Sequence, residues 1–203
     1  IVQIHHGGAQ ALPELTPDGD VVAPSAISLK SFGQQKEHDA REMTAEEIEQ
    51  TIRDFGEATR RAIEAGFDGV EIHGANHYLI HQFVSPYYNR RNDVWADNYK
   101  FPVAVIDEVV KAKKAHANDD FIIGYRLSPE EAESPGISME ITEELIHQIA
   151  NKPLDYIHVS LMDVNSVTRE GKYKGENRLE LIHQWINGRM PLIGIGSVFT
   201  AED

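Results

Sequence analysis

The sequence predicts an α/β protein and, within that class, a partial TIM (β/α)8 barrel of about five β/α units with both termini missing. Strand patterns alternate with helical patterns along the chain, which is typical of parallel strands joined by crossover helices. No glycine-rich dinucleotide fingerprint follows the first strand, so a doubly wound open sheet is the second choice. No internal repeat or low-complexity linker interrupts the 203 residues. We therefore expect one incomplete barrel domain over residues 1–203.

The first half of the chain contains two predicted strands and one long helix. The first strand is expected at about Ile1–His6, and a long polar connection with three prolines follows it. A helix begins at Thr44, because Thr44 and Glu47 have the spacing of a capping box, and it ends at Gly66. Phe67–His73 is the second strand.

The segment after the second strand is unusual. It is rich in histidine, asparagine, tyrosine and arginine, and no hydrophobic periodicity returns before Phe101. We expect a long polar loop here. Such a loop is uncommon inside a compact domain unless it has a function.

The second half continues the alternation of helices and strands. The expected elements are a helix from Pro102 to about Ala115, a strand at Phe121–Leu127, a helix at about Thr142–Ala150, a strand at Leu154–Ser160, a helix at Leu179–Asn187 closed by Gly188, and a strand at Leu192–Gly196. Thr200 and Asp203 have the spacing that begins a further helix. Since the chain also opens inside a strand pattern without an initiator methionine, we expect a piece of a larger protein.

Composition excludes several functional classes. The chain has 33 acidic residues against 19 lysines and arginines, for a net charge of -14. Such a surface repels phosphate backbones and anionic membranes, so we expect neither nucleic acid nor membrane as a partner. There is no cysteine, which excludes disulfides and thiolate nucleophiles and suits a cytoplasmic protein. No apolar run approaches the roughly 20 residues that cross a bilayer, and no signal peptide is visible.

The barrel prediction indicates where chemistry would lie. In such barrels the active site is at the carboxyl ends of the strands. His73, Arg126 and Gly196 all lie at predicted strand ends. Alternation along the second strand puts Glu71 and His73 on the face opposite its apolar residues, so His73 points into the barrel mouth.

The stretch Val70–Asp93, VEIHGANHYLIHQFVSPYYNRRND, resembles the strand-end signature of the old yellow enzyme family of flavin-dependent ene-reductases. The matching positions are His73, Asn76, Tyr78, the following QFVSP, Asn89, Arg91 and Asp93. The resemblance extends in order from Gln3 to Thr200. It implies an enzyme that binds FMN, takes hydride from NADH or NADPH, and passes it to a small electrophilic alkene or to oxygen.

The resemblance also implies roles for single residues. His73 and Asn76 would bind the carbonyl or nitro oxygen of the substrate and stabilise the negative charge that develops as hydride arrives. Tyr78 would be the proton donor, because a phenol is protonated at neutral pH. Gln3 would hydrogen-bond the flavin pyrimidine. Arg126 would lie near the flavin ring nitrogen and carbonyl, where a fixed cation stabilises reduced flavin.

Structural alternatives exist for these residues. A single histidine, asparagine or tyrosine in a loop is more often structural than catalytic. Gln3 alone reads as a polar strand-end residue, and Arg126 can pair with a barrel carboxylate such as Glu71. Three side chains in register with a family signature favour the catalytic interpretation.

The last predicted strand leads into Gly194-Ile195-Gly196-Ser197. Backbone amides at a strand-to-helix turn form an anion site, and the resemblance implies that Gly196 and Ser197 help to hold the FMN phosphate. The chain departs from the family pattern in two places. Ala9 stands where the family usually has an arginine, and residues 95–98 replace a longer loop at the rim of the site.

A second hypothesis is a metal-dependent β/α-barrel hydrolase, because His73, His77 and His81 have the spacing of ligands on one helix face. We expect no metal site, since residues 74–76 are a poor helix start and no clear carboxylate joins the set. His6, in the His5-His6 pair, matches a strand-end motif of the family. A non-catalytic barrel remnant is the third hypothesis. The sequence leaves open whether the protein is a homo-oligomer.

Overall fold

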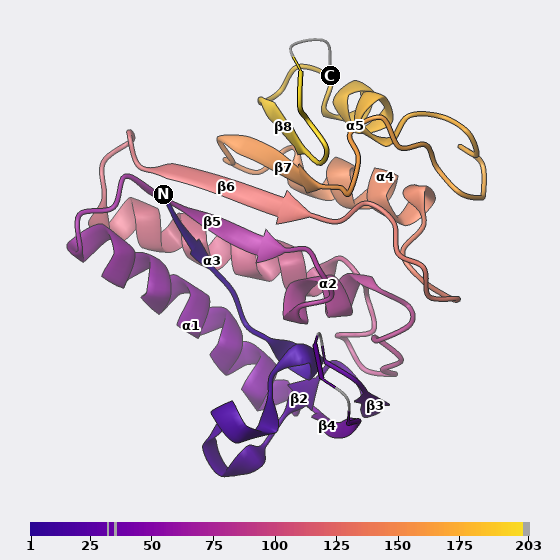
Figure 1. Ribbon diagram of the computed structural model, residues 1–203. Helices are drawn as coiled ribbons and strands as arrows, with labels where there is room; N and C mark the ends of the chain where they lie inside the picture. Colours follow the sequence, from indigo (N-terminus) through magenta and orange to yellow (C-terminus); the bar gives the residue numbers. More distant parts are fainter. Residues whose placement is uncertain (32, 35, 201–203) are drawn as a thin grey trace.

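The computed structural model describes residues 1–31, 33–34 and 36–200. Its main sheet has five parallel strands in the order β1-β5-β6-β7-β8 (Figure 1). These are β1 (Val2–Ile4), β5 (Gly69–Gly74), β6 (Ile122–Leu127), β7 (Tyr156–Ser160) and β8 (Leu192–Ile195). The strand order follows the chain without the reversal of a doubly wound sheet, so the sheet has the topology of a barrel wall.

Helices connect the strands and cover one face of the sheet. They are α1 (Ala45–Glu64), α3 (Lys100–His116), α4 (Met139–Ile149) and α5 (Arg178–Ile186). One hydrophobic core joins these helices to alternate strand residues, namely Val70, Ile72, Ile123, Tyr125, Ile157 and Val159. Each of these six strand side chains is fully shielded from solvent. Because side chains alternate along a strand, the residues between them face the other side of the sheet.

The ends of the helices explain most of the predicted boundaries. Thr44 Oγ1 accepts a hydrogen bond from the Glu47 amide at 3.2 Å, and the Glu47 carboxylate accepts one from the Thr44 amide at 2.8 Å, so the predicted capping box is confirmed. Helix α1 ends at Glu64, and Gly66, two residues later, has a φ of 80°, the left-handed conformation that commonly follows a helix end. Helix α4 begins earlier than predicted, after Ser138, and the Thr142 amide donates to Ser138 O at 3.0 Å within it. The Thr142 hydroxyl does not cap a helix, because it donates to Pro129 O at 2.6 Å.

The connection after β1 is more ordered than we predicted. It contains short 3-10 helices at Gly8–Gln10, Pro13–Leu15 and Pro17–Gly19. It also contains a three-stranded sheet in the order β2-β4-β3, formed by β2 (Val22–Ala23), β3 (Ile27–Leu29) and β4 (His38–Glu42). The prediction of a plain polar connection is therefore wrong. A few small side chains form its separate core, and strands this short give no readable period.

The loop after β5 contains helix α2 (Leu79–Val84), whose six residues are all buried. The prediction of an unbroken polar loop is wrong here. Leu79, Ile80, Phe83 and Val84 have helical spacing, but one and a half turns are too short for a periodicity argument. His73 lies in β5 and His77 precedes α2, so the three histidines do not share one helix face.

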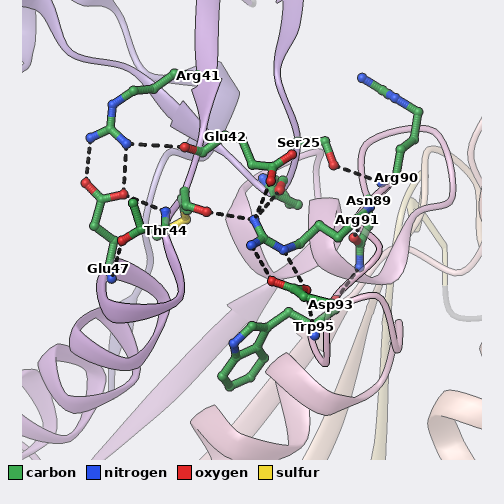
Figure 2. A network of polar contacts seen from close by, with 12 residues as sticks. Ser25, Arg41, Glu42, Thr44, Glu47, Asn89, Arg90, Arg91, Asp93 and Trp95 are labelled. Atoms are coloured by element: carbon green, nitrogen blue, oxygen red, sulfur yellow. Dashed lines mark hydrogen bonds and ion pairs between the residues drawn. The ribbon is translucent and has the colours of Figure 1, made fainter.

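The later part of the same loop is fixed by hydrogen bonds that Figure 2 shows. The Arg91 side chain, only 5% exposed, donates to Pro24 O at 2.8 Å and to Met43 O at 2.7 Å. It also forms an ion pair with Asp93 at 2.6 Å. Asn89 Nδ2 donates to two backbone carbonyls within the loop. This half of the sequence signature therefore attaches the loop to the small sheet.

None of the described helices is both long and apolar enough to span a bilayer. Residues 201–203, which would continue the helix predicted at Thr200, lie outside the described part of the chain.

Candidate active site

The face of the sheet opposite the helices is polar, and strand register aligns its side chains in two rows. One row contains His73, Arg126 and His158, which are direct partners in β5, β6 and β7. The other row contains Gln3 and Glu71, which are partners in β1 and β5. The predicted site residues of three strands are thus brought together at the carboxyl end of the sheet.

Glu71 is the centre of the second row. Its carboxylate accepts hydrogen bonds from Gln3 Nε2 at 2.6 Å, Tyr156 Oη at 2.9 Å and His158 Nδ1 at 2.9 Å. Burial acts to raise the pKa of Glu71, but the three hydrogen bonds hold it below its ordinary value. Glu71 is therefore ionised at neutral pH and satisfied by neighbours other than Arg126. The alternative in which Arg126 pairs with Glu71 is not realised.

Arg126 is connected to Asn76 through a serine. Arg126 Nη2 donates to Ser160 Oγ at 2.9 Å, and Ser160 Oγ lies 3.1 Å from Asn76 Oδ1. A guanidinium has no acceptor, so the serine hydroxyl must accept from Arg126 and use its own proton toward Asn76. Ser128 Oγ likewise accepts a hydrogen bond from the backbone N–H of Asn76 at 3.0 Å and donates one to Asn76 Oδ1 at 3.3 Å. Two hydroxyl donors thus fix the carboxamide oxygen and leave Nδ2 as the end available to a ligand.

His73 is buried and neutral. It is 3% exposed. Burial, with the charge of Arg126 as the next cause, lowers the pKa of His73 to about 4. At neutral pH the imidazole therefore carries one N–H donor and no charge. The Tyr78 ring lies 5.2 Å from the His73 ring between centroids, and the His5 ring lies 5.1 Å from that of Tyr78.

The turn that carries Asn76 is strained. Asn76 and His77 both have left-handed backbones, with φ of 56° and 59°. Non-glycine residues in this region cost on the order of 1–3 kcal/mol each and persist where the surroundings hold them. The hydrogen bond from the backbone N–H of Asn76 to Ser128 Oγ is one such restraint. Asn76, Tyr78 and Ser160 line a cavity of about 880 Å³ at this end of the sheet.

The predicted phosphate-binding turn follows β8. Gly196 has a φ of 132°, and a side chain there would lie 2.5 Å from Leu161 O, so only glycine fits this approach. The Ser197 hydroxyl donates to Met162 O at 2.8 Å. The side chain of Ser197 is therefore used within the protein, and a phosphate would have to rely on backbone amides. Gly194 serves packing, because a Cβ there would meet Leu179 Cδ1 at 2.6 Å.

The histidines form a second cluster beside the first. His81 Nε2 donates to Glu131 Oε2 at 2.7 Å, and His77 Nδ1 lies 3.6 Å from the same oxygen. Our expectation that no carboxylate joins these histidines is therefore wrong. Glu131 follows β6, fifty positions from His81, and only the fold brings the two together.

Comparison with known proteins places the chain in a family. The sequence model of the protein family described as "NADH:flavin oxidoreductase / NADH oxidase family" matches residues 1–203 of this chain. The chain belongs to this family. The resemblance to old yellow enzymes is confirmed, and the hydrolase alternative gains no support from it.

Individual members of the NADH:flavin oxidoreductase family extend the comparison. Probable NADH-dependent flavin oxidoreductase YqiG of Bacillus subtilis (strain 168) is 50% identical over 207 residues, which cover 100% of this chain and 54% of that protein. The chain thus spans about half the length of this relative. Morphinone reductase in complex with tetrahydroNAD has a TM-score of 0.74 and 26% identity, over 97% of this chain and 55% of that one.

The old yellow enzyme homologue from Zymomonas mobilis has a TM-score of 0.75 at 22% identity, over 97% of this chain and 56% of that one. At this identity the likeness shows the fold alone. It confirms that the parallel sheet is part of a TIM barrel, as predicted.

The polar face fits the flavin that the family uses. Among the described residues, neither Arg126 Nε nor His73 Nδ1 has a hydrogen-bond partner, although both atoms are shielded from solvent. A buried polar atom without a partner costs about 1–3 kcal/mol, so each indicates a missing polar ligand. A flat ring system with polar edges, lying on the rows of Gln3 and Arg126, would supply partners. The residues present therefore fit FMN.

Some residues of this site were missed in the sequence analysis. Tyr156, His158 and Ser160 alternate with buried Ile157 and Val159 in β7, and that period-two pattern was a readable signal for a polar inner face. Ser128 and His5 gave no comparable signal, because their roles depend on contacts across the sheet.

Proposed function

We propose that the protein is an FMN-dependent NAD(P)H oxidoreductase that reduces an activated alkene, such as an enone, enal or nitroalkene, or oxygen. The observation that carries this proposal is the oriented Asn76 amide beside the neutral, buried His73. Asn76 lines the cavity, His73 lies near the end of β5, which leads into the turn that carries Asn76, and two neutral donors suit a substrate oxygen that gains negative charge during the reaction. Bound FMN would supply the hydride carrier, reduced by NADH or NADPH and reoxidised by the second substrate.

Gln3 and Arg126 would hold the polar edge of the flavin. Gln3 Nε2 already donates a hydrogen bond to Glu71, so the carboxamide oxygen of Gln3 is left to accept a hydrogen bond from a ligand. Arg126 contributes a positive charge whose Nε is shielded and unpaired among the described residues. A fixed cation at this position favours a flavin that has gained negative charge. Backbone amides at Gly196 and Ser197 would contribute to the phosphate site.

His73 and Asn76 would bind the activating oxygen of the substrate, and Tyr78 would protonate the carbon beside the activating group. Among the described residues the Tyr78 hydroxyl has no hydrogen-bond partner, and Tyr78 lines the same cavity as Asn76. The phenolic proton is therefore free to be given to a bound substrate. The double variant His73→Ala, Asn76→Ala should weaken binding of a phenolic ligand about 10- to 100-fold, as expected for two lost hydrogen bonds. Unchanged affinity would remove the oxygen-binding role.

Two relatives support a nicotinamide as the reductant, since one is named an NADH-dependent flavin oxidoreductase and morphinone reductase was solved in complex with tetrahydroNAD. A cytoplasmic location and a small-molecule acceptor, without nucleic acid or membrane partners, belong to the same proposal. The location and the excluded partners rest on the absence of cysteine and on the net charge of -14, and the small-molecule acceptor rests on the cavity that Asn76 and Tyr78 line.

The test is a visible absorption spectrum of the purified full-length protein before and after anaerobic NADH or NADPH. The proposal expects a yellow protein that bleaches with the nicotinamide and regains its colour with cyclohexenone. Regain with oxygen alone would limit the proposal to an oxidase. A colourless protein that cannot be reconstituted with FMN would end it.

A further inference from the structure

Two histidines and one carboxylate converge beside the proposed alkene site without being needed by it. One nitrogen of His77, one nitrogen of His81 and one oxygen of Glu131 all lie within 4.8 Å of one another. We propose that these three residues form a binding site for a divalent transition-metal ion such as Zn²⁺. The inference does not rest on the proposed flavin chemistry.

The carboxylate is held in the way that a metal ligand is usually held. The Glu131 side chain is 0% exposed. Its Oε1 accepts hydrogen bonds from the Ser85 hydroxyl and from the Ile137 amide, the latter at 2.8 Å. Among the described residues, its Oε2 has two imidazoles as polar neighbours, at 2.7 Å from His81 and 3.6 Å from His77. Outer hydrogen bonds that fix one oxygen and direct the other are a regular feature of metal sites.

The donor set and its spacing suit zinc. Two imidazoles and one carboxylate, with a water in the fourth position, are a known set for tetrahedral zinc. With metal–ligand bonds of about 2.0–2.1 Å, neighbouring ligand atoms in a tetrahedron lie about 3.4 Å apart. The distance from His77 to Glu131 is 3.6 Å, which already fits. The His81 to Glu131 distance of 2.7 Å is a direct hydrogen bond and must open by about 0.7 Å, with loss of the shared proton, when an ion enters.

A second carboxylate points to a cation independently. Glu133 Oε2 is shielded from solvent and has no hydrogen-bond partner among the described residues. The negative charge of Glu133 acts on His77 and on the buried Tyr88. A shielded carboxylate oxygen without a partner is costly when no positive charge is near it. A divalent ion held by Glu131 would supply that charge.

The cluster reaches solvent through His77. His81 is 1% exposed, whereas the His77 side chain is 25% exposed and lines the cavity of about 880 Å³ that also contains Asn76 and Tyr78. An ion would enter past His77 and keep a water on the cavity side. Because His77 stands between Asn76 and Tyr78 in the chain, the ion would also fix the strained turn that carries both.

The experiment uses Zn²⁺ itself as the probe. The full-length protein is treated with EDTA, dialysed and titrated with Zn²⁺ by calorimetry, beside His77→Ala and the matched control His183→Ala, an exposed histidine of α5. We expect about one equivalent to bind the parent and the control. Loss of an outer-shell partner already lowers metal affinity about 10- to 100-fold, so loss of the ligand His77 should lower it by at least about 100-fold. Ser85→Ala should lower it about tenfold.

Two further outcomes keep the inference falsifiable. His73→Ala should bind Zn²⁺ like the parent, and loss of binding in that variant instead of in His77→Ala would place the ion in the alkene site and overturn the inference. A parent protein that takes up no stoichiometric Zn²⁺ would show that His81 and Glu131 are a hydrogen-bonded structural pair. His77 lies at the cavity rim, so its replacement should leave the fold intact, which circular dichroism and flavin content check.

Discussion

Gly124 in β6 provides a sharp test of the packing on the polar face. A Cβ built on Gly124 would lie 2.0 Å from Tyr156 Cζ and 2.4 Å from Tyr156 Oη. The phenol therefore crosses directly over the glycine to reach Glu71 at 2.9 Å. Gly124→Ala should force the ring away, break that hydrogen bond and destabilise the protein.

The magnitude follows from two contributions. Overpacking costs about 1–3 kcal/mol. Loss of a hydrogen bond to a charged group adds about 1.5–3 kcal/mol. Since Tyr156 is only half-buried, we expect the free energy of unfolding to fall by about 3 kcal/mol. Without the clash the sign would be opposite, because glycine inside a strand is about 0.5–1 kcal/mol less favourable than alanine.

The assay is urea unfolding of the flavin-loaded protein and of a double-mutant cycle. Tyr156→Ala removes the obstructing ring, so Gly124→Ala made in that background should no longer destabilise and should recover a small stabilisation. Tyr156→Phe isolates the hydrogen bond, since it retains the ring. If Gly124→Ala costs the same in both backgrounds, the ring does not lie over the glycine and the reasoning is refuted.

Three other predictions concern single residues. Tyr78→Phe should slow reoxidation of the reduced enzyme by an enone about 10²- to 10⁴-fold while leaving reduction by NADH unchanged in anaerobic stopped-flow; equal losses in both half-reactions would exclude a proton donor. Arg91→Lys should lower the free energy of unfolding by about 2–3 kcal/mol, because lysine cannot reach two carbonyls and a carboxylate together, whereas the exposed Arg41→Lys should cost under about 1 kcal/mol; equal costs would refute this. His73 has a folded pKa of about 4, so as pH falls from about 6.5 toward 4 the unfolded chain takes up a proton there that the folded chain does not, and stability should fall. His73→Asn should make the urea midpoint less sensitive to pH in this window, and an unchanged slope would contradict the burial of a neutral imidazole.

Much of the fold was predictable because its determinants are local. The capping box at Thr44 and the left-handed Gly66 set the bounds of α1 from neighbouring residues alone. In β5, β6 and β7, strands of five or six residues, buried apolar side chains recur at alternate positions, which is a pattern that the sequence shows directly. The small sheet was not predictable in this way, because its strands have few residues and pair across loops of irregular conformation. Tertiary contacts, and not local propensity, decide such segments.

The candidate site also contains residues that local sequence could assign and residues that depend on contacts between distant parts of the chain. His73 and Arg126 could be assigned to one mouth from strand alternation and strand ends, and register makes them direct partners. The orientation of the Asn76 amide could not be predicted, since it depends on hydroxyls of Ser128 and Ser160 that are distant in the chain. Glu131 was missed for the same reason.

The division of β5, β6 and β7 into an apolar face and a polar face has a consequence for how the sequence can change over evolutionary time. Alternate positions of these strands face either the hydrophobic core or the polar site, so each set of positions tolerates its own narrow class of point substitutions. Insertion or deletion of one residue exchanges the two classes along the rest of the strand, sending Glu71 and His73 into the hydrophobic core and Ile72 out of it. Length variation among relatives should therefore accumulate in the connections and stay out of these three strands.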